Sequence, residues 1–336
     1  MNENRPADAA SSRLSRRNLL SHAAGLAAAG AVGVTATGCT TRQTLANASP
    51  AQASKTSSGK AVRHGRIQQS IVQWCFSEHW ELEETCEVAK QLGVSSIELV
   101  GTGDLPTLKK HGITCAITSI DMPDDFPFIR GFNNPAYHEM LVAETKRVID
   151  ACAEYGSPNV IAFTGFSHKD VDNMGPDSEH WTREECVANC VAGFKQVVGY
   201  AEEKGVTICM EHLNTRDDSH PMKGHPGYQG DDLDMCLEIC EKVGSPRLKL
   251  LFDIYHVQIM HGDVIRRLHE CRDYLGHIHT AGNPGRHELD DAQEINYPPI
   301  MRTLLELEYE GYVGQEFIPT RDPQQGLHQA VTLCDV

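Results

Sequence analysis

From Gln69 to Phe317, eight short β-branched or apolar runs alternate with amphipathic stretches. This alternation is typical of repeated β-α units around a parallel sheet. Eight such units in roughly 250 residues predict an α/β fold, a (β/α)8 TIM barrel. A doubly wound open sheet is the alternative, but no G-x-G-x-x-G follows the first run to support it. The runs that we predict as strands are residues 70–75, 96–100, 113–119, 159–164, 206–212, 248–253, 275–280 and 312–317.

Amphipathic stretches with apolar residues at spacings of three and four occupy the intervals between these runs and predict helices. The clearest of them are residues 82–92, 137–155, 184–204, 233–243 and 300–307. A glycine follows each one, where a helix C-cap favours a residue that is free to adopt a positive φ. The five glycines are Gly93, Gly156, Gly205, Gly244 and Gly311.

The N-terminal segment differs from the rest in composition. It contains the motif S-R-R-N-L-L at residues 15–20, followed by a stretch to Gly38 without Asp, Glu, Lys or Arg. This arrangement resembles a twin-arginine export signal. A membrane-spanning anchor is the alternative, but Ala, Gly, Thr and Ser are weakly apolar for a bilayer core of about 30 Å. We predict a signal over residues 1–48, a flexible linker over 49–66 and a barrel domain over 67–336.

Two processing points compete within this segment. Residues 46–48 form an A-x-A cleavage pattern, whereas Cys39 follows Thr37-Gly38 in a lipobox-like setting that lacks the usual Leu. We favour cleavage, with lipidation at Cys39 as the second choice. The protein is therefore expected outside the cytoplasm, periplasmic or membrane-attached, with membrane contact only through the signal or a lipid.

The charge of the chain argues against a nucleic-acid partner. The formal net charge is −16, and residues 1–48 hold five Arg and two acids, so the remainder carries 25 basic and 44 acidic groups, a net charge of −19. A nucleic-acid-binding domain is normally basic.

The 12 Cys include no C-x-x-C pair, and we expect those at spacing i, i+4 on predicted helices to be reduced and buried.

The last four predicted strands each end in a residue type that binds metals. These residues are Glu211, Asp253, His279 and Glu316. In a barrel, the carboxyl ends of the strands meet at one face, so the four side chains can converge. Three carboxylates and one imidazole favour Mn²⁺, Mg²⁺ or Co²⁺ over a thiolate-bound structural zinc. Inward-facing carboxylates are costly to bury without a positive partner, so we predict a divalent metal site.

The motifs around these residues resemble the xylose isomerase-like TIM barrel superfamily, in particular its hydroxypyruvate isomerase branch and the related ketose 3-epimerases. The resemblance covers roughly residues 69–319. It implies that the four residues are the metal ligands, that Glu211 and Glu316 also transfer protons, and that His256 and Arg286 contact substrate oxygens. The motifs are E-H-L-N-T-R at 211–216, D-I-Y-H at 253–256, G-H-I-H at 276–279, R-H-E at 286–288, N-Y-P at 296–298 and G-Y-V-G-Q-E at 311–316.

Such a site can move a carbonyl between adjacent carbons of a hydroxy-aldehyde or hydroxy-ketone. A divalent cation stabilises the enediolate, and a carboxylate carries the proton. We therefore expect a metal-dependent intramolecular oxidoreductase of the aldose-ketose type, similar to hydroxypyruvate isomerase, that acts on a small carbohydrate or hydroxy-keto acid. The alternatives are a ketose 3-epimerase, another sugar isomerase, or a non-catalytic exported carbohydrate-binding protein.

Further residues are candidates for contacts with the substrate. Arg216 and Arg286 are the cations that we expect to bind a substrate carboxylate, because a guanidinium can bind two oxygens at once. Glu98 shares a face of its strand with Ser96 and Val100 and is expected at the barrel mouth.

Three features separate the chain from the usual hydroxypyruvate isomerase pattern and keep the epimerase alternative open. The Gly- and Pro-containing loop 217–232 is long, and it is expected to be either a lid over the substrate or a variable surface loop. His279 stands where many hydroxypyruvate isomerases carry Gln. The export signal is also unusual for that branch.

Trp74 and Phe76, at the end of the first strand, are candidates for an apolar wall against the substrate, with core packing as the alternative. Oligomerisation is left open.

Overall fold

The computed structural model describes residues 59–122 and 126–336. The predicted signal and most of the predicted linker lie outside these residues. Residues 59–336 form one compact unit. Contacts with the barrel begin before residue 67: the backbone N–H groups of Ala61 and Val62 both donate to the carbonyl of Leu92, at 3.0 and 3.1 Å. Among the described residues, no helix is both long enough and apolar enough to cross a membrane.

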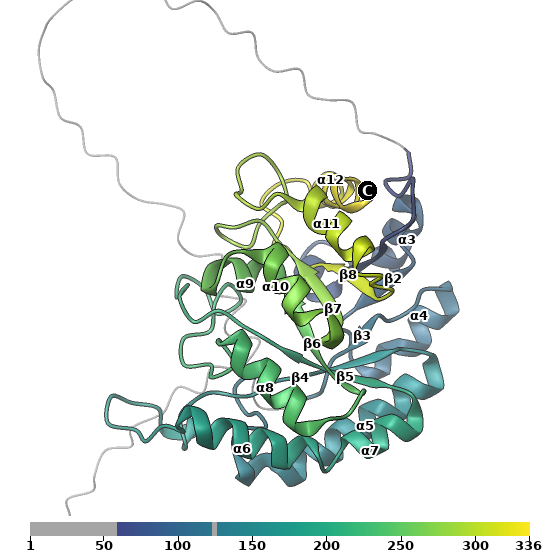
Figure 1. The fold of residues 1–336 in the computed structure, drawn as a ribbon. Coiled ribbons are helices and arrows are strands. Elements are labelled where there is room, and N and C mark those ends of the chain that lie inside the picture. The colour runs from purple at the N-terminus through teal and green to yellow at the C-terminus, as the bar shows by residue number, and fades with distance from the viewer. Residues whose placement is uncertain (1–58, 123–125) are drawn as a thin grey trace, which may run out of the picture. The chain divides into compact units, whose positions relative to one another are not determined.

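Eight parallel strands form a single sheet in the order β2-β1-β8-β7-β6-β5-β4-β3, with the helices outside it (Figure 1). This order confirms the TIM barrel and excludes the doubly wound alternative. The strands are β1 (Gln68–Val72), β2 (Ser96–Glu98), β3 (Ile117–Thr118), β4 (Asn159–Ala162), β5 (Thr207–Glu211), β6 (Leu248–Asp253), β7 (Leu275–Thr280) and β8 (Tyr312–Gln315).

Backbone hydrogen bonds also connect the two ends of this sheet. The N–H of Leu99, just after β2, donates to the carbonyl of Ile117 in β3 at 2.9 Å. The N–H of Ser119, just after β3, donates back to the carbonyl of Val100 at 3.1 Å. The barrel is therefore nearly closed, and the carboxyl ends of all eight strands surround a common mouth.

The α-helices pack around the strands and contribute the outer half of the core. Their bounds are α2 (Gln73–Phe76), α3 (Leu82–Leu92), α4 (Leu105–His111), α5 (His138–Tyr155), α6 (Arg183–Phe194), α7 (Val198–Lys204), α8 (Leu233–Val243), α9 (Ile254–Met260), α10 (Val264–Cys271), α11 (Tyr297–Glu306) and α12 (Pro323–Cys334).

The predicted helices 82–92 and 233–243 match α3 and α8 at both ends. The predicted single helix 184–204 is wrong, because the chain forms α6 and α7 there. The N–H groups of Gln196 and Val197 donate to carbonyls three residues earlier, which tightens the turn between the two helices. The first strand also ends earlier than expected, since residues 73–76 form α2.

Four of the five predicted glycine caps are confirmed. Gly93, Gly156, Gly205 and Gly244 end their helices with φ of 83, 79, 73 and 72°. Gly311 is not a cap, because α11 ends at Glu306. A Cβ at Gly311 would lie 2.3 Å from the hydroxyl oxygen of Tyr309. That glycine therefore makes room for a ring instead of allowing a left-handed turn.

The eleven cysteines in the described part of the chain are all free and buried. The expected reduced state of the i, i+4 pairs is thus what the structure contains.

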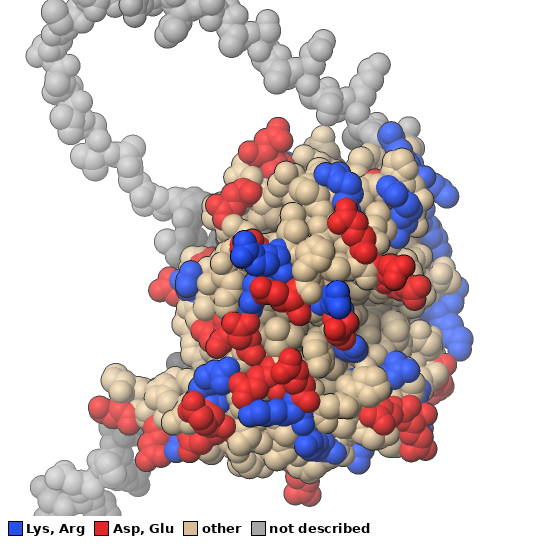
Figure 2. Space-filling model, viewed as in Figure 1, with Lys and Arg blue, Asp and Glu red and all other residues tan. Residues whose placement is uncertain are grey.

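Acidic and basic side chains are interspersed on the face shown in Figure 2, which is typical of a solvated surface.

Candidate metal and substrate site

Four strands bring the predicted metal ligands to one point at the barrel mouth. Glu211 ends β5, Asp253 ends β6, His279 lies in β7, and Glu316 directly follows β8. One ligand atom from each residue lies within 4.8 Å of the others, and all four side chains are buried. Asp253 also begins α9, where its Oδ1 accepts the backbone N–H of Tyr255 at 2.8 Å. This cap fixes the orientation of its second oxygen toward the site.

The hydrogen bonds of His279 define which ring nitrogen is available to a metal. Its Nε2 lies 2.7 Å from Glu98 Oε1. A carboxylate can only accept, so Nε2 carries the proton, and Nδ1 of the neutral ring has a free lone pair. Nδ1 lies 2.7 Å from Glu316 Oε2 but makes no hydrogen bond. Burial opposes a charge on the ring, but Glu316, Glu211 and Glu98 outweigh it and raise the pKa of His279, so without a cation the two groups form an ion pair. A divalent cation would take the place of the second ring proton.

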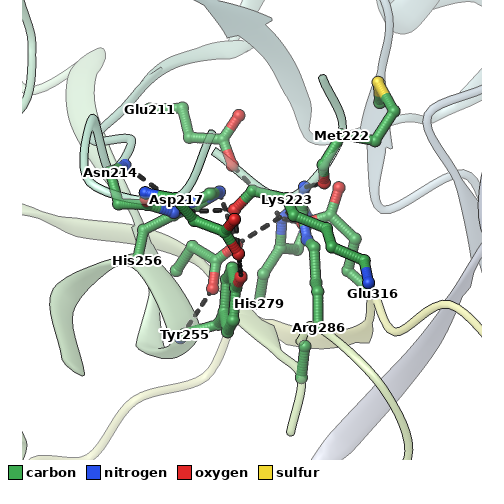
Figure 3. A network of polar contacts seen from close by, with 12 residues as sticks. Glu211, Asn214, Asp217, Met222, Lys223, Tyr255, His256, His279, Arg286 and Glu316 are labelled. Atoms are coloured by element: carbon green, nitrogen blue, oxygen red, sulfur yellow. Dashed lines mark hydrogen bonds and ion pairs between the residues drawn. The ribbon is translucent and has the colours of Figure 1, made fainter. Parts of the chain in front are cut away.

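Arg286 is the cation closest to this carboxylate cluster (Figure 3). Its Nη2 donates to Glu316 Oε2 at 2.5 Å and to Asp253 Oδ2 at 3.2 Å. The guanidinium is stacked on the rings of Trp74 and Tyr255, with centroid distances of 5.3 and 5.7 Å. Arg286 has φ of 58°, an uncommon backbone conformation for a residue with a side chain. The guanidinium is thus held rigidly and is already engaged with protein carboxylates.

The donor set fits a divalent cation. Three carboxylates and one arginine leave two formal negative charges around the four ligand atoms, and a divalent cation balances them. Glu211 Oε1 and His279 Nδ1 are both buried without a hydrogen-bond partner among the described residues. Unpartnered buried polar atoms are costly. A cation between them would remove this cost.

The two glutamates of the cluster experience opposite electrostatic environments. Burial and the neighbouring charge of Glu316 raise the pKa of Glu211. Burial also opposes ionisation of Glu316, but Arg286 and His279 outweigh it and lower the pKa of Glu316 below its usual range. Burial raises the pKa of Asp253 to about 7, although Arg286 acts in the opposite direction. In the absence of a cation, the site therefore disfavours three simultaneous negative charges.

His256 points a ring N–H into the same site. Its Nδ1 accepts the backbone N–H of Asn214 at 3.1 Å and lies 2.7 Å from Asn214 Nδ2. Nδ1 is thus the acceptor, and Nε2 carries the proton. Nε2 is buried, lies 3.5 Å from Asp253 Oδ2 and makes no hydrogen bond. Burial lowers the pKa of His256 well below its ordinary value, so the neutral ring can donate to a substrate oxygen.

Glu98 lies behind His279 and has no solvent-exposed surface. Its Oε1 accepts from His277 Nε2 at 2.8 Å as well as from His279 Nε2. Burial opposes the charge of Glu98, but the two imidazoles outweigh it and lower its pKa to about 2. The structure therefore places Glu98 against a candidate metal ligand, at a greater depth than the mouth position expected from the sequence.

The structure separates the remaining candidates for substrate contact. Arg216 is exposed, and its Nη1 donates to the carbonyl of Ile259 at 2.7 Å, away from the four ligand atoms. Phe76 is buried against Trp80 and Phe317, so core packing is the correct alternative for this residue. Trp74 does reach the site, where its Nε1 donates to Glu316 Oε1 at 3.0 Å.

Sequence reasoning missed three polar residues around the site. His277 lies two positions before His279 in β7, and strand alternation would have placed both rings on the inner face. Asn214 lies within a motif that we identified, but only the fold reveals its bond to His256. Lys223 lies in the long β5–α8 loop (residues 212–232), and no sequence pattern distinguishes it.

Together, the fold and this cluster define a TIM-barrel protein with a candidate divalent-metal site at the carboxyl ends of its strands. The family model described as "Xylose isomerase-like TIM barrel" matches residues 86–333, and the chain belongs to this family. The resemblance predicted from the motifs is thus confirmed.

Curated relatives include isomerases of small hydroxy-keto acids. The chain is 33% identical over 181 residues to the 2-oxo-tetronate isomerase of Cupriavidus necator. The matched region covers 54% of this chain and 63% of that protein. It is 27% identical over 154 residues to the hydroxypyruvate isomerase of Escherichia coli, covering 46% and 57% respectively. The chain therefore spans less than two thirds of the length of each of these relatives.

Solved structures with the same fold include two epimerases and a zinc-binding protein. The 3-keto-D-glucoside 4-epimerase of E. coli has a TM-score of 0.64 at 17% identity, covering 80% of this chain and 99% of that one. A D-psicose 3-epimerase has a TM-score of 0.58 at 16% identity over 80% and 90%. The IOLI protein, solved with a zinc atom, has a TM-score of 0.55 at 14% identity over 80% and 95%. At these identities the similarity establishes the fold alone.

Proposed function

We propose that this protein is a divalent-metal-dependent isomerase that moves a carbonyl between adjacent carbons of a small hydroxy-keto acid through an enediolate. The observation that carries the proposal is the convergence of three buried carboxylates and the Nδ1 atom of His279 at one point. The isomerases among the curated relatives support this chemistry. Hydroxypyruvate is the substrate that we favour.

Glu211, Asp253, His279 and Glu316 would hold the cation. When bound, Mn²⁺, Mg²⁺ or Co²⁺ supplies Lewis acidity toward the carbonyl and the neighbouring hydroxyl of the substrate. The ring N–H of His256 is positioned to donate to a substrate oxygen, since it has no other hydrogen-bond partner among the described residues. Arg286 restrains Glu316 and Asp253, so their orientation is set before the substrate enters.

Glu211 and Glu316 are the proposed proton carriers. They come from β5 and from the residue after β8, and both carboxylates are buried among groups that influence their protonation. A carboxylate on each side of the substrate can remove a proton from one carbon and return it to the next. Return of the proton to the same carbon would produce an epimerase, so the two activities differ in how the substrate lies between the glutamates.

The test is turnover by the purified barrel domain with Mn²⁺, Mg²⁺ or Co²⁺ and after chelation. The substrates are hydroxypyruvate, 2-oxo-tetronate and a panel of ketoses. We expect isomerisation of a hydroxy-keto acid that chelation abolishes and added metal restores. Epimerisation of ketoses alone would favour the 3-epimerase. Binding without turnover of any compound would favour a carbohydrate-binding protein.

A further inference from the structure

Lys223 is a cation at the site that the carboxylates of the cluster do not neutralise. It is partly buried in the β5–α8 loop. Its Nζ lies 3.2 Å from His287 Nε2. Among the described residues, no carboxylate lies within the 4.0 Å that defines an ion pair with this ammonium group. The Asp217 carboxylate interacts with Lys223 through space but lies outside ion-pair distance, so the ammonium group can still bind an anion from outside the protein.

His287 orients this ammonium group. Its Nδ1 lies 3.1 Å from the carbonyl oxygen of Ile318, which can only accept, so Nδ1 carries the proton. Nε2 then has the lone pair and accepts one proton from Lys223 Nζ. Two ammonium protons remain free to donate to the oxygens of a carboxylate.

The backbone of the loop fixes Lys223 beside the candidate metal site. The carbonyl of Lys223 accepts from Asn214 Nδ2 at 2.8 Å and from the hydroxyl of Tyr255 at 3.0 Å. The carbonyl of Met222 accepts from Arg286 Nη1 at 2.6 Å. Arg286 and Asn214 also contact Glu316 and His256, so the residues that line the site are the same ones that hold this part of the loop (Figure 3).

The two arginines predicted to bind a substrate carboxylate are less suited to it than Lys223. Arg286 already donates to two carboxylates and a backbone carbonyl. Arg216 is exposed and bonded to Ile259. We infer that Lys223 binds the carboxylate of an anionic 2-oxo acid substrate and that His287 is its positioning residue. This inference rests on the proposed function, because it names the substrate class of the same site.

Two three-carbon compounds isolate the contribution of the carboxylate. Hydroxypyruvate and dihydroxyacetone share the hydroxymethyl ketone and differ by a carboxylate in place of a hydroxymethyl group. Calorimetry on the full chain with Mn²⁺ gives the affinity for each compound, independently of turnover. We expect Lys223→Met to reduce the ratio of the two affinities, hydroxypyruvate over dihydroxyacetone, by about 10- to 100-fold, the effect of one lost charge-assisted bond.

Matched variants control for charge and for folding. Lys223→Arg keeps the charge and should retain most of the ratio, whereas His287→Phe should lower it less than Lys223→Met does. Lys110→Met removes an exposed lysine of α4 that pairs with Glu83 of α3 at 3.3 Å, and it should leave the ratio unchanged. The inference is overturned if Lys223→Met keeps the wild-type ratio, or if the wild type does not prefer hydroxypyruvate. Preferential binding without turnover of any substrate would reject the proposed function alone.

Discussion

At the scale of single residues, Glu316 combines three roles that a strand-end glutamate rarely has together. It contributes an oxygen to the candidate metal site, accepts the indole N–H of Trp74 and forms an ion pair with Arg286. Arg286 keeps its carboxylate ionised, and Trp74 fixes the orientation of the second oxygen. The fixed orientation favours proton transfer at a substrate carbon, whereas the lowered pKa keeps the carboxylate in its basic form but weakens it as a base.

Replacing Glu316 by Gln should abolish proton exchange at the substrate carbon while preserving the fold. General acid–base catalysis contributes about 10²- to 10⁴-fold in rate, so a loss of that size is expected. Deuterium uptake from solvent into the substrate measures it, with circular dichroism as the check on folding. The matched control is Glu139→Gln on the exposed surface of α5. Deuterium uptake at the wild-type rate would remove Glu316 from the mechanism.

The structure changes the expected role of Glu98 from a substrate contact at the barrel mouth to a hydrogen-bond partner of His279. Its carboxylate fixes the ring of His279, and a carboxylate behind a metal-bound imidazole raises the basicity of the ligand. Glu98→Gln should therefore weaken Mn²⁺ binding by about 10- to 100-fold. Titration with Mn²⁺ measures this, with the exposed Glu83→Gln as control. Unchanged Mn²⁺ affinity with a raised KM at saturating metal would instead support the substrate contact expected from the sequence.

At the scale of elements, the β5–α8 loop connects the metal ligands to the outer edge of the mouth. Gly224 sits where the loop turns back on itself, and a Cβ there would lie 2.1 Å from the carbonyl oxygen of Asp217 and 2.7 Å from Asn214 Oδ1. Neither atom can move without disturbing a hydrogen bond of the loop, because the Asn214 side chain also accepts the N–H of Asp217 and contacts His256.

Gly224→Ala should displace the loop and raise KM, with a fall of about 1–3 kcal/mol in the free energy of unfolding from overpacking. Denaturant unfolding and steady-state kinetics provide the two measurements. Gly199→Ala, in α7, is the control: nothing lies within 4 Å of its added Cβ, and removing a helical glycine should stabilise by about 0.5–1 kcal/mol. If Gly224→Ala resembled Gly199→Ala in both measurements, the loop would not be tightly packed.

At the scale of the whole molecule, the first and last described segments of the barrel domain are joined by Asp335. Its carboxylate accepts the backbone N–H groups of Arg63, His64 and Gly65 at 2.5, 2.7 and 2.8 Å. Burial opposes the charge, but these three donors outweigh it and lower the pKa of Asp335. A carboxyl group with a lowered folded-state pKa stabilises the fold above its unfolded pKa of about 3.9, and this contribution disappears as the pH falls through the folded value.

Asp335→Asn should therefore lower the free energy of unfolding by about 1–3 kcal/mol at pH 7, because charge-assisted bonds become neutral ones. The difference from the wild type should shrink as the pH falls below about 4, where the wild-type carboxyl also becomes neutral. Urea unfolding at a series of pH values measures both effects. A difference that is independent of pH would show that the charge of Asp335 contributes nothing.

The sequence of the N-terminal segment leads to a proposal that does not depend on the barrel. We propose that the twin-arginine motif directs export of the folded protein, which suits an enzyme that takes up its metal before leaving the cytoplasm. Replacing Arg16 and Arg17 by Lys should retain the unprocessed protein in the cytoplasm, as measured by cell fractionation and immunoblotting. Export of this variant at the wild-type level would contradict the proposal.

The sequence alone predicted the number of strands, their parallel arrangement and the four residues at the strand ends, whereas the strand order that excludes an open doubly wound sheet came from the structure. The reason is that periodicity and chain order are local properties, and parallel strands place their carboxyl ends together whatever their neighbours. The break between α6 and α7 could not be predicted, because it depends on a change of hydrogen-bond partner within one turn.

Only the tertiary structure decided which residues support the strand-end cluster. Glu98 and His279 are 181 positions apart, and Trp74 and Glu316 are 242 apart, so no local pattern reports their contacts. The same holds for Lys223, because no sequence pattern distinguishes it from the other lysines of the chain. It becomes informative only when the fold places it next to His287 and beside a site where the arginine is already engaged.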